Sequence, residues 1–368
     1  MGLRGHSGCD RLSHSGASGQ GARRQFHSQR GGGAACTRRG LATWTARGIG
    51  NWSLEEVLKT YRLLENSDAG SDLLHGRTGP FPIRQQTFEE LTPSLRAFVE
   101  AAASQGFARI ADPNGDRQNG VTAYPFNILS GVRRNTAFVY LSDEVRGRPN
   151  LTVVGLAEVD SVEFSGTTAT AVRTVDGTIH EGGEIILSAG AYGSAAILMR
   201  SGIGVPGDLE RHGIKLVADR PVGLRFQDHP FHYSVHALRP DAARMTPAAG
   251  AILWTASSRA HADELDLHIS VSHLIDGAVS PTGSAVVLAT GLVRPESMGS
   301  VKLRSASPKA APLIDYNFLA TPRDRSRMVG RQAQPPDSEG GRVCRCHRRR
   351  VAARRAHPKR RGPRPGRP

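Results

Sequence analysis

Apolar residues recur at helical spacing in two stretches of the first third of the chain. The first stretch begins at Leu54 and the second covers residues 91–105. The second repeats apolar side chains every three or four positions and stops at Gly106, a residue suited to end a helix. Both stretches predict helices with one buried face. The first follows the polar sequence Asn51-Trp52-Ser53, which suits a helix cap, and its apolar positions are Leu54, Val57, Leu58, Tyr61 and Leu64.

From residue 150 the pattern changes to the β-branched and alternating composition of strands. Asp176-Gly177 predicts the turn of a hairpin. Residues 184–190 form an apolar run that ends in small residues and predicts a buried strand, and residues 194–201 predict a helix behind it. A strand, a glycine-containing turn and a helix in this order can place a cofactor at the helix N-terminus. Residues 252–305 alternate in short runs, such as 265–271 and 285–292, and predict an antiparallel sheet.

The two ends of the chain show neither pattern. Residues 1–40 hold seven Arg and one acidic residue, and residues 330–368 hold thirteen Lys or Arg and two acidic residues. Residues 41–329 hold 28 basic and 30 acidic side chains, so the formal net charge of +15 comes from the ends. In residues 330–368 dense Arg with Pro and Gly repels itself and breaks helices, and residues 1–40 have no apolar periodicity that could bury a face, so we predict disorder in both ends.

All four cysteines, Cys9, Cys36, Cys344 and Cys346, lie in these ends, which suits a reducing cytoplasm. Cys344-Arg345-Cys346-His347 lacks a second ligand pair, so we assign no metal site. The sequence has no apolar run of 18 residues and no secretory h-region at its start, so we expect a soluble cytoplasmic protein without a membrane span.

The run GAYGSAAILMRSGIG, residues 190–204, resembles the second signature of the glucose-methanol-choline (GMC) oxidoreductases, with Ala195 where that signature usually has Pro or Ser. Further landmarks of that family occur in the correct order, and the resemblance covers about residues 44–328. They are His75-Gly76, Arg134-Asn135-Thr136-Ala137, Pro221-Val222-Gly223, Gln227-Asp228-His229 and a late strand pair at 295–317.

The resemblance implies a mixed α/β fold, with an incomplete FAD-binding Rossmann-like domain, a substrate domain with an antiparallel sheet and helices, and disordered basic ends. It implies FAD as cofactor, a small-molecule alcohol oxidised at its CH–OH group in the manner of choline dehydrogenase, and an electron acceptor that the sequence leaves open. The divisions that we expect are a disordered, non-native segment at 1–43, a helical and loop region at 44–149, the remaining FAD domain at 150–235, the substrate domain at 236–329 and a disordered Arg/Pro-rich tail at 330–368.

The family's opening GxGxxG turn and its late His-bearing segment have no counterpart in this sequence. Gly31-Gly32-Gly33 has no strand before it and no helix after it, and His347 and His357 stand among Arg and Pro. We hypothesise that both ends are truncated or out of frame and that activity is impaired. No catalytic residue is assigned.

The resemblance and the strand-turn-helix pattern together place the adenosine half of FAD against Ser188, Ala189 and Gly190, where small residues allow close approach. A tight structural turn would explain the same residues. Val159 matches the family position whose backbone meets adenine, although it could equally be a core strand residue. Asp228-His229 is explained as well by a helix-capping Asp and a hydrogen-bonded His as by catalysis.

Four further histidines, His232, His236, His268 and His273, lie on strand-like segments, and some of them could line a substrate cavity. None is offered as the catalytic base. The alternative function is that of a non-catalytic fragment whose basic tails bind nucleic acid or other anions nonspecifically. No aromatic residue interrupts the C-terminal tail, so specific nucleic-acid recognition is not expected.

Overall fold

The computed structural model describes residues 41–42, 44–239, 245–246, 248–261, 264–273 and 280–329. Predictions about residues 1–40 and 330–368, including the four cysteines, lie outside the described residues.

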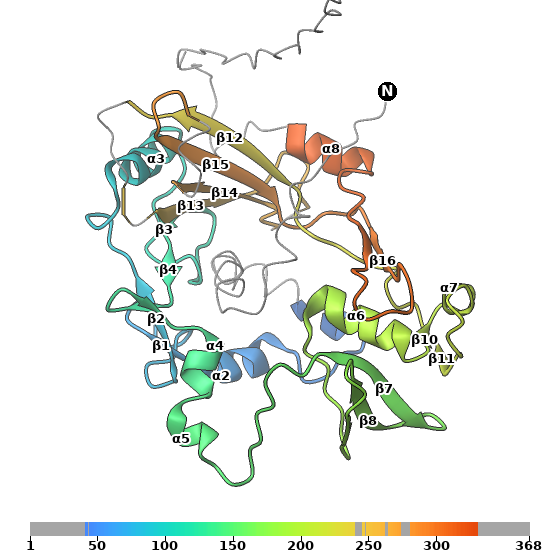
Figure 1. Cartoon of the computed structure of the whole chain (residues 1–368). Helices are drawn as coiled ribbons and strands as arrows, with labels where there is room; N and C mark the ends of the chain where they lie inside the picture. The colour runs from blue at the N-terminus through green and yellow to red at the C-terminus, as the bar shows by residue number, and fades with distance from the viewer. Residues whose placement is uncertain are drawn as a thin grey trace, which may run out of the picture.

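A five-stranded sheet forms the upper half of the molecule in Figure 1. Every neighbouring pair in it is antiparallel, which confirms the sheet predicted for residues 252–305. The predicted run 285–292 coincides with one of its strands. In spatial order the strands are β12 (Phe231–Ala237), β15 (Ala285–Leu292), β14 (Leu267–Ser272), β13 (Ala249–Thr255) and β3 (Gly120–Ala123).

One face of this sheet packs against α3 (Pro93–Ser104). Leu95 and Val99 of the helix meet Ala251 and Leu253 of β13, and all four side chains are buried. Burying one Leu or Val side chain stabilises a fold by roughly 1.5–3 kcal/mol, so this contact holds the sheet region together. The predicted helix is confirmed, with Pro93 as its first residue and Gly106 beyond its end at φ +90°.

The other predicted helix is confirmed as α2 (Leu54–Leu64), with the Ser53 hydroxyl accepting a hydrogen bond from the Glu56 backbone N–H. It leads into β1 (Glu65–Ser67), which pairs in parallel with β2 (Phe81–Gln85). Residues 125–146 then complete this part of the molecule, on the left of Figure 1, with short elements. They are β4 (Pro125–Phe126), β5 (Ile128–Leu129), β6 (Val132–Arg133), α4 (Thr136–Tyr140) and α5 (Asp143–Arg146).

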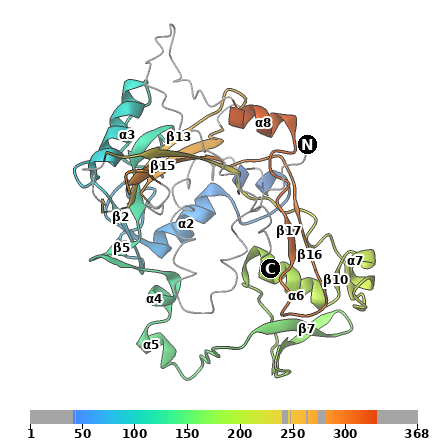
Figure 2. The ribbon, with the colours of Figure 1, turned by 45° about the horizontal axis from the view of Figure 1, so that its top comes forward.

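A second region lies at the lower right of Figure 1 around α6 (Gly190–Arg200). The helix begins four residues before the predicted start and packs on the hairpin of β7 (Val159–Ser165) and β8 (Thr168–Thr174). The predicted Asp176-Gly177 turn joins β8 to β9 (Ile179–Glu181), with Gly177 at φ +89°. The late strand pair is also confirmed, beside α6 in Figure 2. The remaining elements are β10 (Ile203–Gly204), α7 (Pro206–Glu210), β11 (Ala218–Asp219), β16 (Ser300–Lys302) and β17 (Leu313–Asp315).

Two predicted strands are wrong. Residues 151–158 and 182–189 belong to no strand, and most of their side chains are exposed, including Val154 at 56%, Leu156 at 102% and Ile186 at 77%. A strand needs a neighbour for its backbone hydrogen bonds, and neither segment has one among the described residues. Strand-like sequence alone therefore does not produce a strand here.

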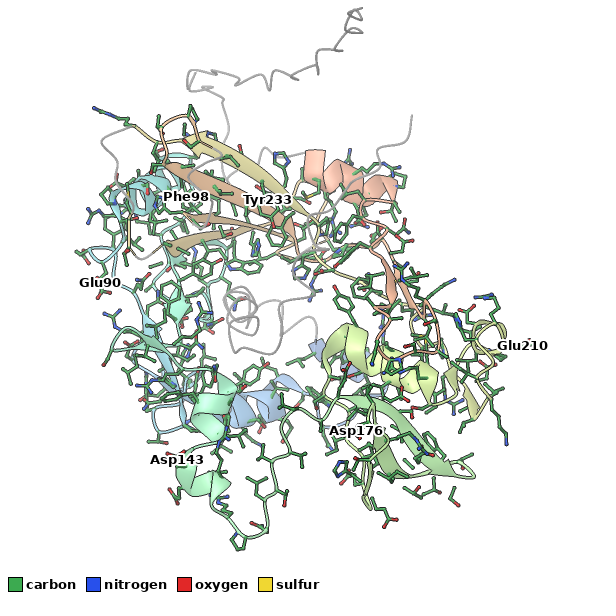
Figure 3. All side chains as sticks on the ribbon, in the orientation of Figure 1. Glu90, Phe98, Asp143, Asp176, Glu210 and Tyr233 are labelled. Carbon is green, nitrogen blue, oxygen red and sulfur yellow. The ribbon has the colours of Figure 1, made fainter. Side chains whose placement is uncertain are left out.

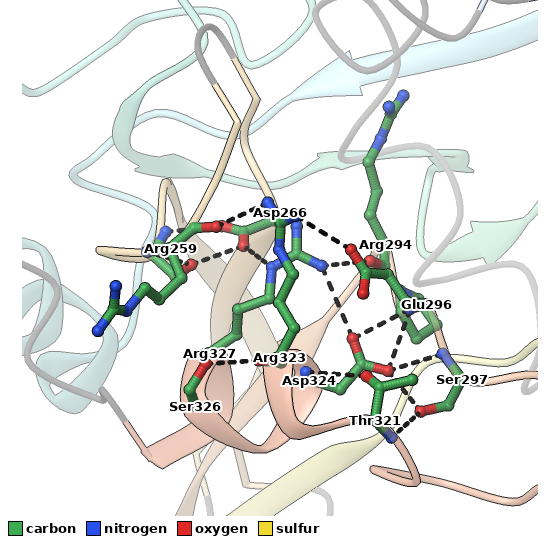
Figure 4. A network of polar contacts seen from close by, with 12 residues as sticks. Arg259, Asp266, Arg294, Glu296, Ser297, Thr321, Arg323, Asp324, Ser326 and Arg327 are labelled. Atoms are coloured by element: carbon green, nitrogen blue, oxygen red, sulfur yellow. Dashed lines mark hydrogen bonds and ion pairs between the residues drawn. The ribbon is translucent and has the colours of Figure 1, made fainter.

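The last described helix, α8 (Pro322–Val329), is attached to the sheet region by a buried ionic cluster (Figure 4). The guanidinium of Arg327, 1% exposed, lies 2.8 Å from Asp266 and 3.0 Å from Glu264. Asp324 accepts hydrogen bonds from the backbone N–H groups of Glu296 and Ser297. The cluster joins α8 to the ends of β14 and β15.

Candidate cofactor and substrate site

The N-terminus of α6 is open to solvent. Ser188, Ala189 and Gly190 are all exposed, and no side chain caps the helix. Gly190 has φ +80°, and a Cβ built on it would meet no atom within 4 Å. The first N–H groups of a helix attract polar and anionic groups, so this end is suited to part of a dinucleotide. The backbone N–H of Ala189 is held by the Ser194 hydroxyl at 3.0 Å.

Val159 lies at the other end of the same helix. It is the first residue of β7, opposite Thr174, and its carbonyl accepts a 3.4 Å hydrogen bond from Arg200 at the end of α6. Eleven helical residues span about 16 Å, so the structure does not bring Val159 into contact with Ser188, Ala189 or Gly190. These residues could meet one ligand only if that ligand extends along α6.

Several family landmarks in the sequence have a structural explanation. A Cβ on Gly76 would lie 1.8 Å from the carbonyl oxygen of Arg62, and one on Gly223 would lie 2.0 Å from that of Val301. Side chains larger than hydrogen cannot be placed at either position without moving the backbone. Asn135 caps α4 by accepting a hydrogen bond from the Phe138 N–H at 2.8 Å.

His75 is held between two carboxylates. Its Nδ1 lies 2.9 Å from Glu65 and its Nε2 lies 2.9 Å from Asp112, and the ring is nearly buried. The hydrogen bonds to Asp112 and then Glu65 raise the pKa of His75 to about 9. A protonated imidazole at neutral pH can donate to both carboxylates at once, so His75 joins residues far apart in sequence.

The predicted histidines differ in their surroundings. His273 is hydrogen-bonded to Ser94 at 2.7 Å, and His236 is exposed and bonded to Ser234 at 3.0 Å. His268 is buried on β14. The alternative reading of Asp228 as a helix cap is wrong, because residues 224–230 are not helical. The Asp228 side chain instead accepts a hydrogen bond from the His229 backbone N–H.

The sheet face opposite α3 carries aromatic side chains that the sequence analysis did not single out. Tyr124, Phe126, Ile252 and Trp254 form a buried cluster there. His229 stands at its edge, beside a pocket of about 330 Å³ that Gln227 and Arg294 also line. Burial lowers the pKa of His229, against the opposing effect of Asp228, which favours a neutral ring. This face is therefore a candidate wall for an organic substrate.

Comparison with known families matches residues 34–231, more than half the chain, to the model described as GMC oxidoreductase. The chain belongs to the GMC oxidoreductase family. Members of this family are enzymes, and FAD is their cofactor. The resemblance drawn from residues 190–204 and the mixed α/β fold class are thereby confirmed.

Two curated relatives are named for different substrates. The oxygen-dependent choline dehydrogenase of Paraburkholderia phymatum is 32% identical over 321 residues, which cover 78% of this chain and 54% of that protein. The 5-(hydroxymethyl)furfural oxidase of Methylovorus sp. is 33% identical over 287 residues, covering 75% of this chain and 52% of that protein. The chain thus spans about half the length of these GMC relatives.

Solved structures agree on the fold. Pyridoxine 4-oxidase from Mesorbium loti superposes with a TM-score of 0.72 at 30% identity, covering 81% of this chain and 60% of that one. Formate oxidase gives a TM-score of 0.67 at 22% identity, over 80% of this chain and 62% of its own length. The second likeness concerns the fold alone.

The described residues fit one part of FAD. The uncapped α6 N-terminus and the open space at Gly190 leave room for a polar group of a dinucleotide. The segments 151–158 and 182–189, which have no strand partner among the described residues, run directly into β7 and α6. Within the ranges that the structure covers, no group of His, Cys, Asp or Glu is arranged to hold a metal ion, and no helix is long and apolar enough to cross a bilayer.

Proposed function

We propose that this chain belongs to an FAD-dependent oxidoreductase that acts on the CH–OH group of a small-molecule alcohol. The GMC match, the alcohol-oxidising relatives and the open N-terminus of α6 support this proposal. When bound, FAD would supply the hydride acceptor for oxidation of the alcohol carbon. The chain's own part is to bind the cofactor at α6 and to present the sheet face of Trp254 to the substrate.

The observation that carries the cofactor assignment is the geometry of Gly190. Its φ of +80° turns the chain into α6, and nothing lies within 4 Å of a Cβ placed there. We place the adenosine half of FAD against Ser188, Ala189 and Gly190, with Val159 farther along α6. The electron acceptor, dioxygen or a carrier, is left open.

We also propose that FAD binds weakly to this chain alone. Residues 151–158 and 182–189 have no strand partner among the described residues and are mostly exposed, so ordering them around a ligand costs conformational entropy of about 1–2 kcal/mol per residue fixed. Cofactor binding must offset that cost, and the purified chain is expected to be colourless or faintly yellow.

The test is a titration of the full chain with FAD, followed by the quenching of flavin fluorescence, on wild type and Gly190→Val. We expect Gly190→Val to weaken FAD binding at least tenfold, because a branched side chain disfavours the positive φ and occupies the open space. No quenching at millimolar FAD would contradict the proposal.

Gly177→Val is the matched control. Gly177 also has a positive φ, of +89°, and open space around its Cβ position, but it lies in the turn between β8 and β9. The two substitutions introduce similar backbone strain, so both should lower stability by a similar amount. Equal loss of FAD affinity in the two variants would show that Gly190 acts through folding alone.

A further inference from the structure

One row of residues crosses four strands on the sheet face opposite α3. Trp254 of β13 pairs with His268 of β14, His268 with Gly291 of β15, and Gly291 with Phe231 of β12. The ring centroid of His268 lies 5.0 Å from that of Trp254 and 5.3 Å from that of Phe231. The imidazole is thus enclosed by two aromatic rings.

Gly291 makes this enclosure possible. A Cβ on Gly291 would lie 2.7 Å from Cε1 of Phe231 and 2.8 Å from Nε2 of His268. Real Cβ contacts are not that short, so any other residue would drive the two rings apart. The row is a cross-strand arrangement that depends on register, with side chains of alternate residues sharing one face.

The polar atoms within this row have no partners. His268 is 2% exposed and Trp254 is 5% exposed. Among the described residues, neither ring nitrogen of His268 nor the indole N–H of Trp254 makes a hydrogen bond. Buried donors and acceptors are rarely left unpaired because their desolvation is not repaid, so three neighbouring ones require an explanation.

His268 is neutral at ordinary pH. Burial, with a smaller effect of His229, lowers its pKa to about 4. A neutral imidazole offers one N–H donor and one acceptor nitrogen, and the Trp254 indole adds a second donor. These three atoms match the oxygen atoms of an uncharged ligand, such as hydroxyl, carbonyl or ring ether oxygens.

The neighbouring row, on the side away from Asp266 and its ionic cluster, carries no charged side chain either. The next row along the sheet contains Tyr233, Ala289, Ser270, Ile252 and Thr122, and no Asp, Glu, Lys or Arg stands in either row. Aromatic rings alone could attract a quaternary ammonium group. Such a group has no lone pair and no N–H, however, so it could pair with none of the three polar atoms, and choline would have only its single hydroxyl for them.

The Phe231 side chain lies between His268 and the exposed residues of β12. The ring of Phe231 covers the imidazole and stacks 5.8 Å from Tyr233, which is 62% exposed and labelled on β12 in Figure 3. The 330 Å³ pocket lined by His229 opens two residues before Phe231. Access to His268 from this side therefore requires the Phe231 ring to move.

We propose that Trp254 and His268 form a binding subsite for the oxygen atoms of an uncharged planar alcohol, which enters by displacing the Phe231 ring. The assignment of an alcohol rests on the proposed function. The subsite itself would select 5-(hydroxymethyl)furfural over choline, the two kinds of substrate that the names of the curated relatives mention.

The experiment measures calorimetric binding of 5-(hydroxymethyl)furfural and of choline to the full chain without added flavin. We expect 5-(hydroxymethyl)furfural to bind and choline to give no signal at ten times the concentration. His268→Phe should weaken the binding of 5-(hydroxymethyl)furfural about fivefold or more, and Trp254→Phe about threefold, because each removes hydrogen bonds and keeps a ring. His236→Phe, the same exchange at an exposed position of β12, should leave binding unchanged.

Stability separates a binding role from a structural one. Replacing an unpaired buried imidazole by a phenyl ring of similar shape should keep or raise the urea midpoint while ligand binding falls. Three outcomes would each overturn the proposal. They are tighter binding of choline than of 5-(hydroxymethyl)furfural, no binding of 5-(hydroxymethyl)furfural, and equal affinity for 5-(hydroxymethyl)furfural in wild type and His268→Phe.

The proposed function can fail separately. If the chain never binds FAD but binds 5-(hydroxymethyl)furfural in a way that depends on His268, the subsite is supported and the oxidoreductase assignment is wrong. If the chain binds FAD through Gly190 but His268→Phe binds 5-(hydroxymethyl)furfural as tightly as wild type, the proposed function is supported and the subsite is wrong.

Discussion

The sheet region and the α6 region contain similarly strand-like sequences, but beside α6 only β7, β8 and β9 form a sheet and two strand-like segments stay unpaired. Each inner strand of the five-stranded sheet has two partners, and its α3 face is covered by Leu95 and Val99. Beside α6, residues 151–158 and 182–189 have comparable apolar content but no strand partner among the described residues. The difference shows that backbone pairing, rather than strand propensity, decides which segment becomes ordered.

Removing the central cation of the buried ionic cluster should cause the largest loss of stability in the sheet region. Arg327→Met leaves Asp266, Glu264 and Asp324 buried near one another without their guanidinium. We expect the free energy of unfolding to fall by about 3–5 kcal/mol, because unpaired buried charges are costly. The measurement is urea denaturation followed by circular dichroism.

Arg323→Met on the same helix is the control for that prediction. Arg323 is partly exposed and pairs with Glu296 at 3.2 Å, so its loss should cost at most about 1 kcal/mol. Similar losses in the two variants would mean that the cluster around Arg327 adds nothing to the stability of the sheet region.

The pH dependence of stability should reveal His75, which ties β1 to the loop of Asp112. Its folded pKa of about 9 is above the unfolded value of 6.5, so its stabilising effect is complete below pH 6.5 and is lost as the pH rises through 9. Allowing for screening, the loss is about 1–2 kcal/mol. His75→Gln should flatten the change in urea midpoint between pH 6.5 and 9.5, whereas an unchanged slope would contradict this role.

Substitutions in the unpaired segments should have the smallest effect. Leu156 is fully exposed at φ +59°, and Ile186 is 77% exposed, so Leu156→Asn and Ile186→Ser remove no packed side chain. We expect changes within about 0.5 kcal/mol and better solubility. A loss above 2 kcal/mol in either variant would show that the segment is packed as firmly as the sheet.

The sequence by itself determined the family, the helices α2 and α3, the Asp176-Gly177 hairpin and the antiparallel character of residues 252–305. These features depend on local periodicity, caps and turns, which neighbouring residues set. Only the tertiary structure decided that residues 184–190 stay unpaired and that β3 joins a sheet more than one hundred residues away in the chain. It also decided that Trp254, His268 and Phe231 share one row, because strand register depends on pairings between distant segments. The placement of FAD at Ser188, Ala189, Gly190 and Val159 remains a prediction.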